Sequence, residues 1–386
     1  MGPKTPTLLV ALLMLHPACG SSDDGANAGF APAAVPSFPQ VPYRGGPRLT
    51  EPEIIPVFFA SDPLRDDLSQ FYQWLDQTDY LTAAVKEYGI GSATLKTPVI
   101  LTTEAPKTVD DVDIATFLAA ATGDKTLPPP GANSAFVLHY PASTVVTLGG
   151  AKGCEQFGGY HGRTSVPGGA LQGMVAYSVV PRCSWDGEDL RLTTNFATHE
   201  IVETITDPMG ALDPGWQLDD TPGSGTEAWA AIGGRELADL CENQMYHAID
   251  AYWVQDIWSN EAAAAFLNPC QPGDADRAFF TVVTDATIVH AAPGEEVSIE
   301  AIATSNKPTA DWELAVSLYP PPSDFDGAAK LSKTSVNNGD RVVVTVNVPP
   351  VPPMNAGRSV YRFTIDSLEA DASGFYHPWP VMVVVP

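Results

Sequence analysis

The spacing of apolar residues changes near residue 275, and this change restricts the chain to a two-part architecture. From Phe279 onward, seven short runs alternate apolar and polar residues, and Gly, Pro, Asn or Asp residues separate them. Alternation with a period of two is typical of half-buried strands. Seven strands in so short a segment predict an all-β, immunoglobulin-like sandwich over residues 276–386.

Residues 49–272 combine two kinds of pattern. The run Glu53–Ala60 and two later runs, SAFVLHYP and GMVAYSVVP, are short and rich in β-forming residues. The stretch from Leu64 to Gly89 and the stretch Val109–Ala121 instead repeat apolar residues at helical spacing. Interleaved helices and strands predict one α/β-type domain.

The N-terminus resembles a bacterial lipoprotein signal. An apolar run, Leu8–Leu15, follows a lysine and precedes Ala-Cys-Gly; it is far shorter than the roughly 20 residues that span a bilayer. We therefore expect a signal peptide over 1–18, a lipidated Cys19 and a flexible tether over 19–48, rich in Gly, Ala, Pro and Ser. An ordinary signal peptidase site near Ala18 is the alternative.

The charge balance narrows the possible partners. The chain has 20 Lys and Arg against 46 Asp and Glu, a formal net charge of −26. Such a surface repels phosphate backbones, so we expect no nucleic-acid partner. It also repels anionic lipids, so contact with a membrane would depend on the lipid at Cys19. These features predict a protein exported across the inner membrane and anchored at the outer membrane or cell surface.

The cysteine count agrees with an oxidising compartment. Of five cysteines, the assignment of Cys19 to lipid leaves an even four. Four cysteines allow three pairings, and we favour the sequence-local one, Cys154–Cys183 and Cys241–Cys270. None forms a C-x-x-C pair, which disfavours a structural zinc knuckle.

The segment Leu190–Pro208 contains the strongest candidate for chemistry. It predicts a helix that ends at Asp207, because the residue before a proline avoids the α conformation. His199 and Glu203 are four residues apart and share one helix face, while Glu200 is offset from them. The apolar face carries Ala197, Ile201, Val202 and Ile205. The string H-E-x-x-E is a carboxylate variant of the zincin helix, in which the outer residues bind a metal and the Glu between them is the general base.

Other catalytic classes have less support. The sequence has no G-x-S-x-G motif for serine chemistry, and no phosphate-binding glycine motif follows a strand. A retaining glycosidase needs two carboxylates on opposite sides of a cleft, which suits Glu200 and Glu203 on one helix poorly.

Several segments together resemble a known family. GGYHG (Gly158–Gly162), THEIVETITDP, PGWQLDD, RELADLCE and IWSN…NPC resemble a group of secreted bacterial proteins. Those proteins look like the plant phosphate-induced or exordium-like family, which has Cys-Gly-x-His-Gly, His-Glu-x-x-Glu and Thr-Asp/Asn-Pro elements. The resemblance covers roughly residues 50–272. It implies a zincin-like domain of the α+β class, with a mixed sheet and an active-site helix. Gly158 stands where the plant family has Cys, and that family implies no defined activity.

The likeness to zincins also suggests a third metal ligand. In zincins with a downstream glutamate ligand, an aspartate one turn later orients the ligating histidine. Glu236 matches that ligand, and Asp239 matches the outer residue that would orient His199. Asp239 as the ligand is the first alternative and His161 the second. We expect Asp207 to be a helix-end residue.

The predicted ligand set has consequences for the metal. One histidine and two carboxylates neutralise a divalent cation, which then polarises a carbonyl less than it does with two histidines and one glutamate. We expect Zn²⁺, with Mn²⁺ or Ca²⁺ also compatible with a carboxylate-rich site. The acidic cluster of Asp213, Asp219 and Asp220 lacks an EF-hand pattern and is expected to be a solvated loop.

These observations predict a cell-surface metallohydrolase, with a peptide or other polymer as substrate. His199, Glu203 and Glu236 would bind the metal, and Glu200 would be the general base. The alternative is a non-catalytic envelope lipoprotein with a structural or vestigial metal site and a β-sandwich that binds a partner. The sequence does not define the substrate.

Overall fold

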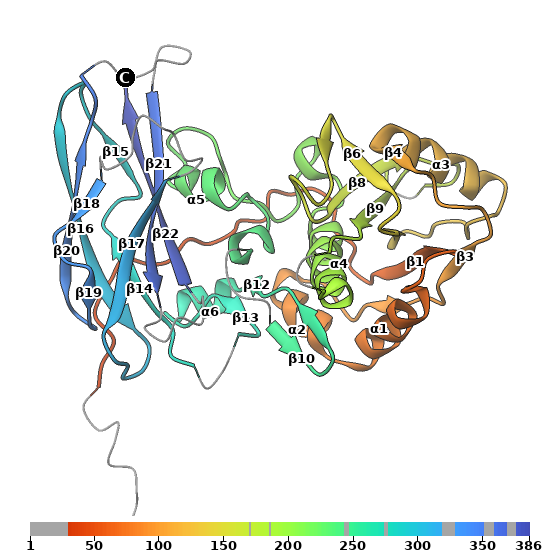
Figure 1. Ribbon diagram of the computed structural model, residues 1–386, viewed down its shortest axis with the longest axis horizontal. Coiled ribbons are helices and arrows are strands. Elements are labelled where there is room, and N and C mark those ends of the chain that lie inside the picture. The colour runs from red at the N-terminus through yellow and green to blue at the C-terminus, as the bar shows by residue number, and fades with distance from the viewer. Residues whose placement is uncertain are drawn as a thin grey trace, which may run out of the picture.

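The computed structural model describes residues 30–169, 171–184, 187–242, 247–273, 277–318, 329–350, 359–368 and 376–386. It contains an α/β body and a β-sandwich, joined by a helical segment (Figure 1). The predicted signal peptide and Cys19 lie outside the described residues. None of the helices within the described ranges has the length and apolar character needed to span a membrane.

The α/β body is built on one mixed sheet with the strand order β2-β1-β5-β9-β8, and β3 also pairs with β1. All neighbouring strands in it run parallel except β8, which is antiparallel to β9 at the edge. Its strands are β1 (Glu53–Phe59), β2 (Thr94–Leu95), β3 (Val99–Leu101), β5 (Ser134–Tyr140), β8 (Tyr160–Ser165) and β9 (Met174–Pro181). Every residue of β5 is buried, which fits a central strand covered on both faces.

Helices cover both faces of this sheet. Helix α4 (Asp189–Thr206) contacts β5, β8 and β9, and α1 (Arg65–Gln77) and α2 (Tyr80–Val85) pack beside it. Helix α3 (Asp111–Gly123) lies over the other face and contacts β8. The apolar side chains accordingly form separate cores on the two faces of the sheet.

The predicted helices are present, with small differences at their ends. The stretch predicted from Leu64 to Gly89 is broken after α1 by Thr78, whose backbone is extended. It ends as predicted at Gly89, whose φ of 72° is a left-handed conformation that suits glycine. The helix predicted from Val109 begins two residues later, because Asp110 and Asp113 form a capping box at its start.

Shorter elements complete the α/β body and the helical segment. The short strands are β4 (Thr108–Asp110), β6 (Val145–Leu148), β7 (Ala151–Lys152), β10 (His247–Ile249), β11 (Tyr252–Val254), β12 (Ile257–Trp258) and β13 (Cys270–Gln271). The short helices are α5 (Glu227–Ile232), α6 (Asn260–Ala264) and the 3₁₀ turns Lys86–Tyr88, Gly210–Leu212 and Asp239–Cys241.

The C-terminal part is a sandwich of two sheets, and all seven predicted strands are present. One sheet has the order β14-β16-β20-β18 and the other β15-β22-β21-β17-β19. The strands are β14 (Phe280–Thr284), β15 (Ile288–His290), β16 (Glu296–Ser305), β17 (Trp312–Leu318), β18 (Ala329–Leu331), β19 (Ser335–Val336), β20 (Arg341–Asn347), β21 (Ser359–Leu368) and β22 (Tyr376–Val385).

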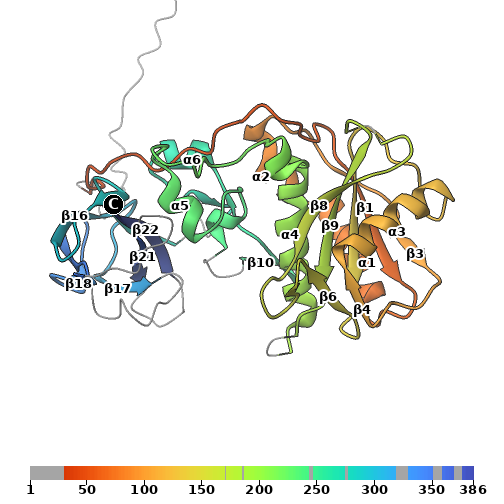
Figure 2. The same cartoon turned by 90° about the horizontal axis from the view of Figure 1, so that it is seen from above.

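Tryptophans join the sandwich to the rest of the chain. Trp229 of α5 lies edge-on against Trp258 of β12, with ring centroids 5.5 Å apart, and against Trp379 of β22 at 5.1 Å. Helices α5 and α6 accordingly lie between the sandwich and the α/β body (Figure 2). Such contacts between large apolar rings fix how the two parts meet.

The N-terminal segment departs from the prediction of a flexible tether. From residue 30 onward the chain is packed along the protein: Phe38 and Val41 are buried. The amide of Asn260 exchanges two hydrogen bonds of 2.8 Å with the backbone of Val41. The tether prediction is therefore wrong for residues 30–48, since composition alone does not show which few apolar residues find a partner surface.

Both predicted disulfides are present. Cys154 is bonded to Cys183 and Cys241 to Cys270, each with a sequence separation of 29 residues. The second bond links the 3₁₀ turn at Asp239–Cys241 to β13. It therefore restrains a loop that contributes to the site described next.

Candidate metal centre

From Leu192 to its end, helix α4 is buried or half-buried, so the glutamates of its H-E-x-x-E motif face an enclosed site. Its apolar face packs in the core as predicted, while Glu200 and Glu203 are only 4% and 3% exposed. The hairpin β10-β11 covers the outer side, where Thr198 accepts a hydrogen bond of 3.0 Å from the backbone of Gln255. Thr194 donates another to the carbonyl of Trp253 at 2.9 Å.

His199, Glu203 and Asp239 come together at the inner side of this helix. Nε2 of His199 lies 3.2 Å from Oε1 of Glu203 and 3.6 Å from Oδ1 of Asp239. The other carboxylate oxygen of Asp239 accepts hydrogen bonds from the backbone N–H groups of Arg235 and Glu236, at 3.0 and 3.2 Å. One nitrogen and two oxygens from these three side chains lie within 4.8 Å of one another, close enough to share a metal ion.

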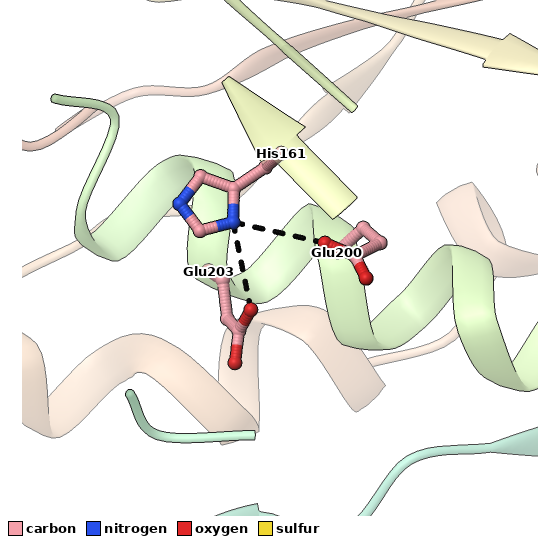
Figure 3. Close-up of side chains that lie close together, drawn as sticks. All are labelled: His161, Glu200 and Glu203. Carbon is pink, nitrogen blue, oxygen red and sulfur yellow. Dashed lines mark ion pairs between the residues drawn. The ribbon is translucent and has the colours of Figure 1, made fainter. Parts of the chain in front are cut away.

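His161 forms a second group with the same helix. It projects from the edge strand β8, and its Nδ1 lies 3.7 Å from Oε2 of Glu200 and 3.5 Å from Oε2 of Glu203 (Figure 3). Its Nε2 faces Oε1 of Glu236 at 3.5 Å. His161, Glu200 and Glu203 likewise place three ligand atoms within 4.8 Å of one another.

A cavity of about 630 Å³ opens over both groups. Among the described residues that line it are six carboxylates and two histidines, and none is a lysine or arginine. Oε2 of Glu200 and Oε1 of Glu236 are buried without a hydrogen-bond partner. Buried carboxylate oxygens that lack donors are costly, and a cation would satisfy them.

Glycine at position 159 makes room for the general-base candidate. A Cβ atom there would lie 2.7 Å from Cγ and Oε1 of Glu200. No real Cβ tolerates such a contact, so any other residue at 159 would displace this side chain. The GGYHG motif thus supplies both a histidine and the space beside Glu200.

Opposite charges alter the titration of the two histidines. Burial lowers the pKa of His161, but the charge of Glu236 and the nearby carboxylates of Glu200 and Glu203 raise it well above its usual value. Burial also lowers the pKa of His199, and Glu203 and Asp239 outweigh this effect and raise it well above 6.5. The metal-free pocket therefore holds protons that a cation would displace.

The carboxylates divide into two kinds. Burial raises the pKa of Glu200, Glu236 and Asp239, in each case more than the neighbouring histidines lower it. Burial also acts to raise the pKa of Glu203, but the His199 charge and hydrogen bonds from both histidines hold it below its usual range. Glu203 is therefore the carboxylate most favoured as an anion, which is the form that binds a metal.

Each residue predicted for the site reaches this pocket, although the contacts differ from those expected. Glu236, predicted as the third ligand, lies against His161, and Asp239, predicted to orient His199, directs a carboxylate oxygen at its Nε2. Asn195, Gln255 and Glu242 also line the cavity and were not predicted. Glu242 could have been suggested by its place in RELADLCE, three residues after Asp239.

The other acidic residues play structural roles. Asp207 is buried and accepts hydrogen bonds from the backbone of Gly215 and the amide of Gln217, at 2.8 and 3.1 Å, as expected of a helix-end residue. Asp219 forms an ion pair with Arg44 at 2.8 Å, and Asp220 forms one with Arg235 at 3.2 Å. Across the described part of the chain, both groups suited to a metal lie in the pocket below α4.

Comparisons with known proteins leave the function open. No protein-family model and no curated protein matches the chain. Among solved structures, the chain is similar to a PapD-like domain of human CEP192, with 18% identity over 27% of this chain and 82% of that one and a TM-score of 0.20. It is similar to the periplasmic chaperone SfaE, with 11% identity, 27% and 57% coverage and a TM-score of 0.22.

A third solved structure is a conjugative transposon lipoprotein from Bacteroides eggerthii. It shares 10% identity over 26% of this chain and 95% of that chain, with a TM-score of 0.18. At TM-scores this low, none of these likenesses supports an argument about function.

Proposed function

We propose that this chain is a metal-dependent hydrolase with a zincin-like centre on α4, acting on peptide bonds. The observation that carries the proposal is the convergence of His199, Glu203 and Asp239, with the buried Oε2 of Glu200, which has no hydrogen-bond partner, in the same cavity. A helix packed under a mixed sheet whose edge strand is antiparallel supports the zincin-like interpretation.

We infer that Asp239, rather than Glu236, is the third ligand. Its Oδ1 faces Nε2 of His199 at 3.6 Å, while its Oδ2 is held by two backbone N–H groups. Glu236 faces the second histidine, His161. A set of one imidazole and two carboxylates fits zinc, which takes nitrogen and oxygen ligands in this kind of geometry, and also suits manganese.

The chain's own residues supply the remaining steps. A bound divalent cation supplies Lewis-acid polarisation of the scissile carbonyl and lowers the pKa of water. Glu200 accepts the proton of the attacking water and transfers it to the leaving nitrogen. Burial raises the pKa of Glu200. A general base works best when its pKa lies near the working pH, because it must accept a proton and later release it.

The charge of the cavity suits a substrate with a cationic group. The described lining contains six carboxylates and no lysine or arginine. A peptide with Lys or Arg near the scissile bond would therefore bind more tightly than an acidic one. Two disulfides support an extracytoplasmic location, and we propose attachment to the cell envelope through Cys19.

The experiment compares metal-stripped and reloaded protein on a fluorogenic peptide library. We expect cleavage to stop with a chelator and return with one equivalent of Zn²⁺. Glu200→Gln, supplied with one equivalent, should keep its metal but lose about 10²–10⁴-fold in turnover. Glu188→Gln is the matched control, because Glu188 precedes the same helix, is half-buried outside the cavity lining and forms an ion pair with Arg191 at 3.4 Å.

Two outcomes would contradict this proposal in different ways. If the protein binds metal but cleaves nothing, the alternative of a structural metal site in a binding protein takes its place. If Glu200→Gln cleaves as fast as wild type, the general-base assignment is wrong.

A further inference from the structure

Glu203 faces two histidines from different elements at once. Its Oε1 lies 3.2 Å from Nε2 of His199, and its Oε2 lies 3.5 Å from Nδ1 of His161. Two oxygens of one carboxylate directed at two imidazoles is the arrangement of a bridging ligand. Each histidine also has a further carboxylate on the same side, Asp239 for His199 and Glu200 for His161.

One divalent cation matches the charge of only two of the carboxylates in this pocket. Glu200, Glu203, Glu236 and Asp239 contribute four negative charges when all are ionised. These groups are enclosed, because Glu200 and Glu203 are 4% and 3% exposed, and no described lining residue is a lysine or arginine. Buried like charges repel one another unless a counter-charge is present, and two divalent cations would neutralise the set.

The donor set itself matches two ions. The two groups together offer three carboxylates and two imidazoles, one carboxylate being shared. Mixed carboxylate and histidine ligands of this kind hold the pair of metals in di-iron and di-manganese carboxylate proteins. Oε2 of Glu200 is buried and has no hydrogen-bond partner, and it points at Nδ1 of His161. Glu236 faces the opposite nitrogen of that ring at 3.5 Å, where a carboxylate fixes the tautomer of a metal-binding histidine.

We propose that His161, Glu200 and Glu203 form a second divalent-cation site, which shares Glu203 as a bridge with the first site at His199 and Asp239. Glu236 is the residue that holds His161 in position for it. This inference rests on the proposed function, which places one metal ion at His199, Glu203 and Asp239, and it adds a second ion beside the first. The ligands of the second ion would be Nδ1 of His161, Oε2 of Glu200 and Oε2 of Glu203.

Occupation of this second site changes the role of Glu200. A carboxylate oxygen that binds a cation no longer accepts a proton, so the general base is withdrawn when the second ion binds. The protein would therefore work with one ion and be inhibited by two. Free metal concentration then regulates the site through the same residue that serves catalysis.

The test is a Zn²⁺ titration of the metal-stripped full chain, with bound zinc measured by equilibrium dialysis and elemental analysis. We expect two ions per wild-type chain, bound in two steps. Glu200→Gln and His161→Ala should each bind one ion, with the affinity of the first step unchanged. Glu155→Gln should still bind two, because Glu155 lines the same cavity but is exposed and pairs with Lys152 at 3.6 Å.

A peptide-cleavage assay adds a second measurement. The rate should rise with the first equivalent and fall about 10²-fold as the second binds, the size expected for loss of a general base. Circular dichroism and thermal unfolding verify that each variant folds, and the two variants lie on different elements, β8 and α4.

The outcomes separate this inference from the proposed function. One ion in wild type, bound equally by Glu200→Gln, overturns the second site and leaves the first intact. Two ions retained in both folded variants overturn the assignment of its ligands. No bound zinc overturns both proposals.

Discussion

The backbone N–H of Asp239 donates a hydrogen bond of 3.2 Å to Oε1 of Glu203. Glu203 is the last residue of the H-E-x-x-E motif, and Asp239 begins a 3₁₀ turn in a distant loop. Glu203 therefore positions the turn that carries Asp239, the other candidate ligand. A site assembled in this way needs little rearrangement to bind a cation, which favours tight binding.

Substitutions at Asp239 and Glu236 test which of the two residues is the third metal ligand. Asp239→Asn should weaken binding of the first zinc ion strongly, because a charged ligand becomes a neutral amide. Glu236→Gln should leave the affinity for the first ion unchanged and lower the affinity for the second about 10–100-fold. This is the usual effect of removing the outer partner of a ligating histidine. Isothermal titration calorimetry measures both steps. The opposite pattern, with the first ion lost only in Glu236→Gln, would make Glu236 the ligand.

Gly159→Ala should reduce activity without loss of the first metal ion. The added Cβ would approach Cγ and Oε1 of Glu200 to 2.7 Å, so the carboxylate must move. We expect turnover to fall about 10²-fold or more, as for a displaced general base, with the KM for a peptide little changed. Gly123→Ala is the control, since its Cβ would meet nothing closer than 3.9 Å. Equal activity of the two variants would contradict the role given to Glu200.

The two disulfides offer a matched pair of variants, because both close loops of 29 residues. Replacement of either pair by serine should lower the free energy of unfolding by about 3.6 kcal/mol, by the chain-entropy estimate. The double variant Cys241→Ser/Cys270→Ser should also lower the affinity for the first zinc ion, because Cys241 shares its turn with Asp239. The double variant at the other disulfide should not. Urea unfolding and zinc titration measure the two effects. An equal loss of zinc affinity in both double variants would argue against this coupling.

Burial of His139 predicts acid sensitivity in the α/β body. Burial and the charge of Arg182 lower the pKa of His139 from 6.5 to about 3. The unfolded chain therefore binds a proton between pH 6.5 and 3 that the folded chain does not. Stability contributed by the neutral ring is complete above pH 6.5 and declines as the pH falls towards 3, at about 1.4 kcal/mol per unit.

His139→Gln should remove this part of the pH dependence. Urea unfolding of metal-free protein between pH 6.5 and 4 should show a shallower decline than wild type. The control is His290→Gln, because His290 is exposed on β15. An unchanged slope in His139→Gln would show that the ring is protonated in the folded protein.

Local sequence patterns predicted much of the fold. The helix predicted to end at Asp207 spans Asp189–Thr206, because apolar periodicity and the following proline act within a few residues. All seven predicted strands of the sandwich are present, because alternation of apolar and polar residues is also a local pattern. The disulfide pairing followed from proximity in sequence.

The parts that sequence did not predict depend on contacts between distant segments. His161 ranked last among the ligand candidates, yet strand β8 brings it within 4 Å of both glutamates of α4. The enclosure of α4 by β11 and by the loop at Asp239 also comes from distant segments, which the pattern of the helix's own residues does not show. Residues 30–48 pack through a few apolar side chains that composition alone does not distinguish.

The most direct test of the metal centre is anomalous X-ray diffraction at the zinc edge, from crystals loaded with one equivalent of Zn²⁺. We expect one peak, at about 2.0–2.2 Å from Nε2 of His199, a carboxylate oxygen of Glu203 and Oδ1 of Asp239. Either no peak in this pocket, or a peak held by other residues such as Asp213 and Asp220, would contradict it.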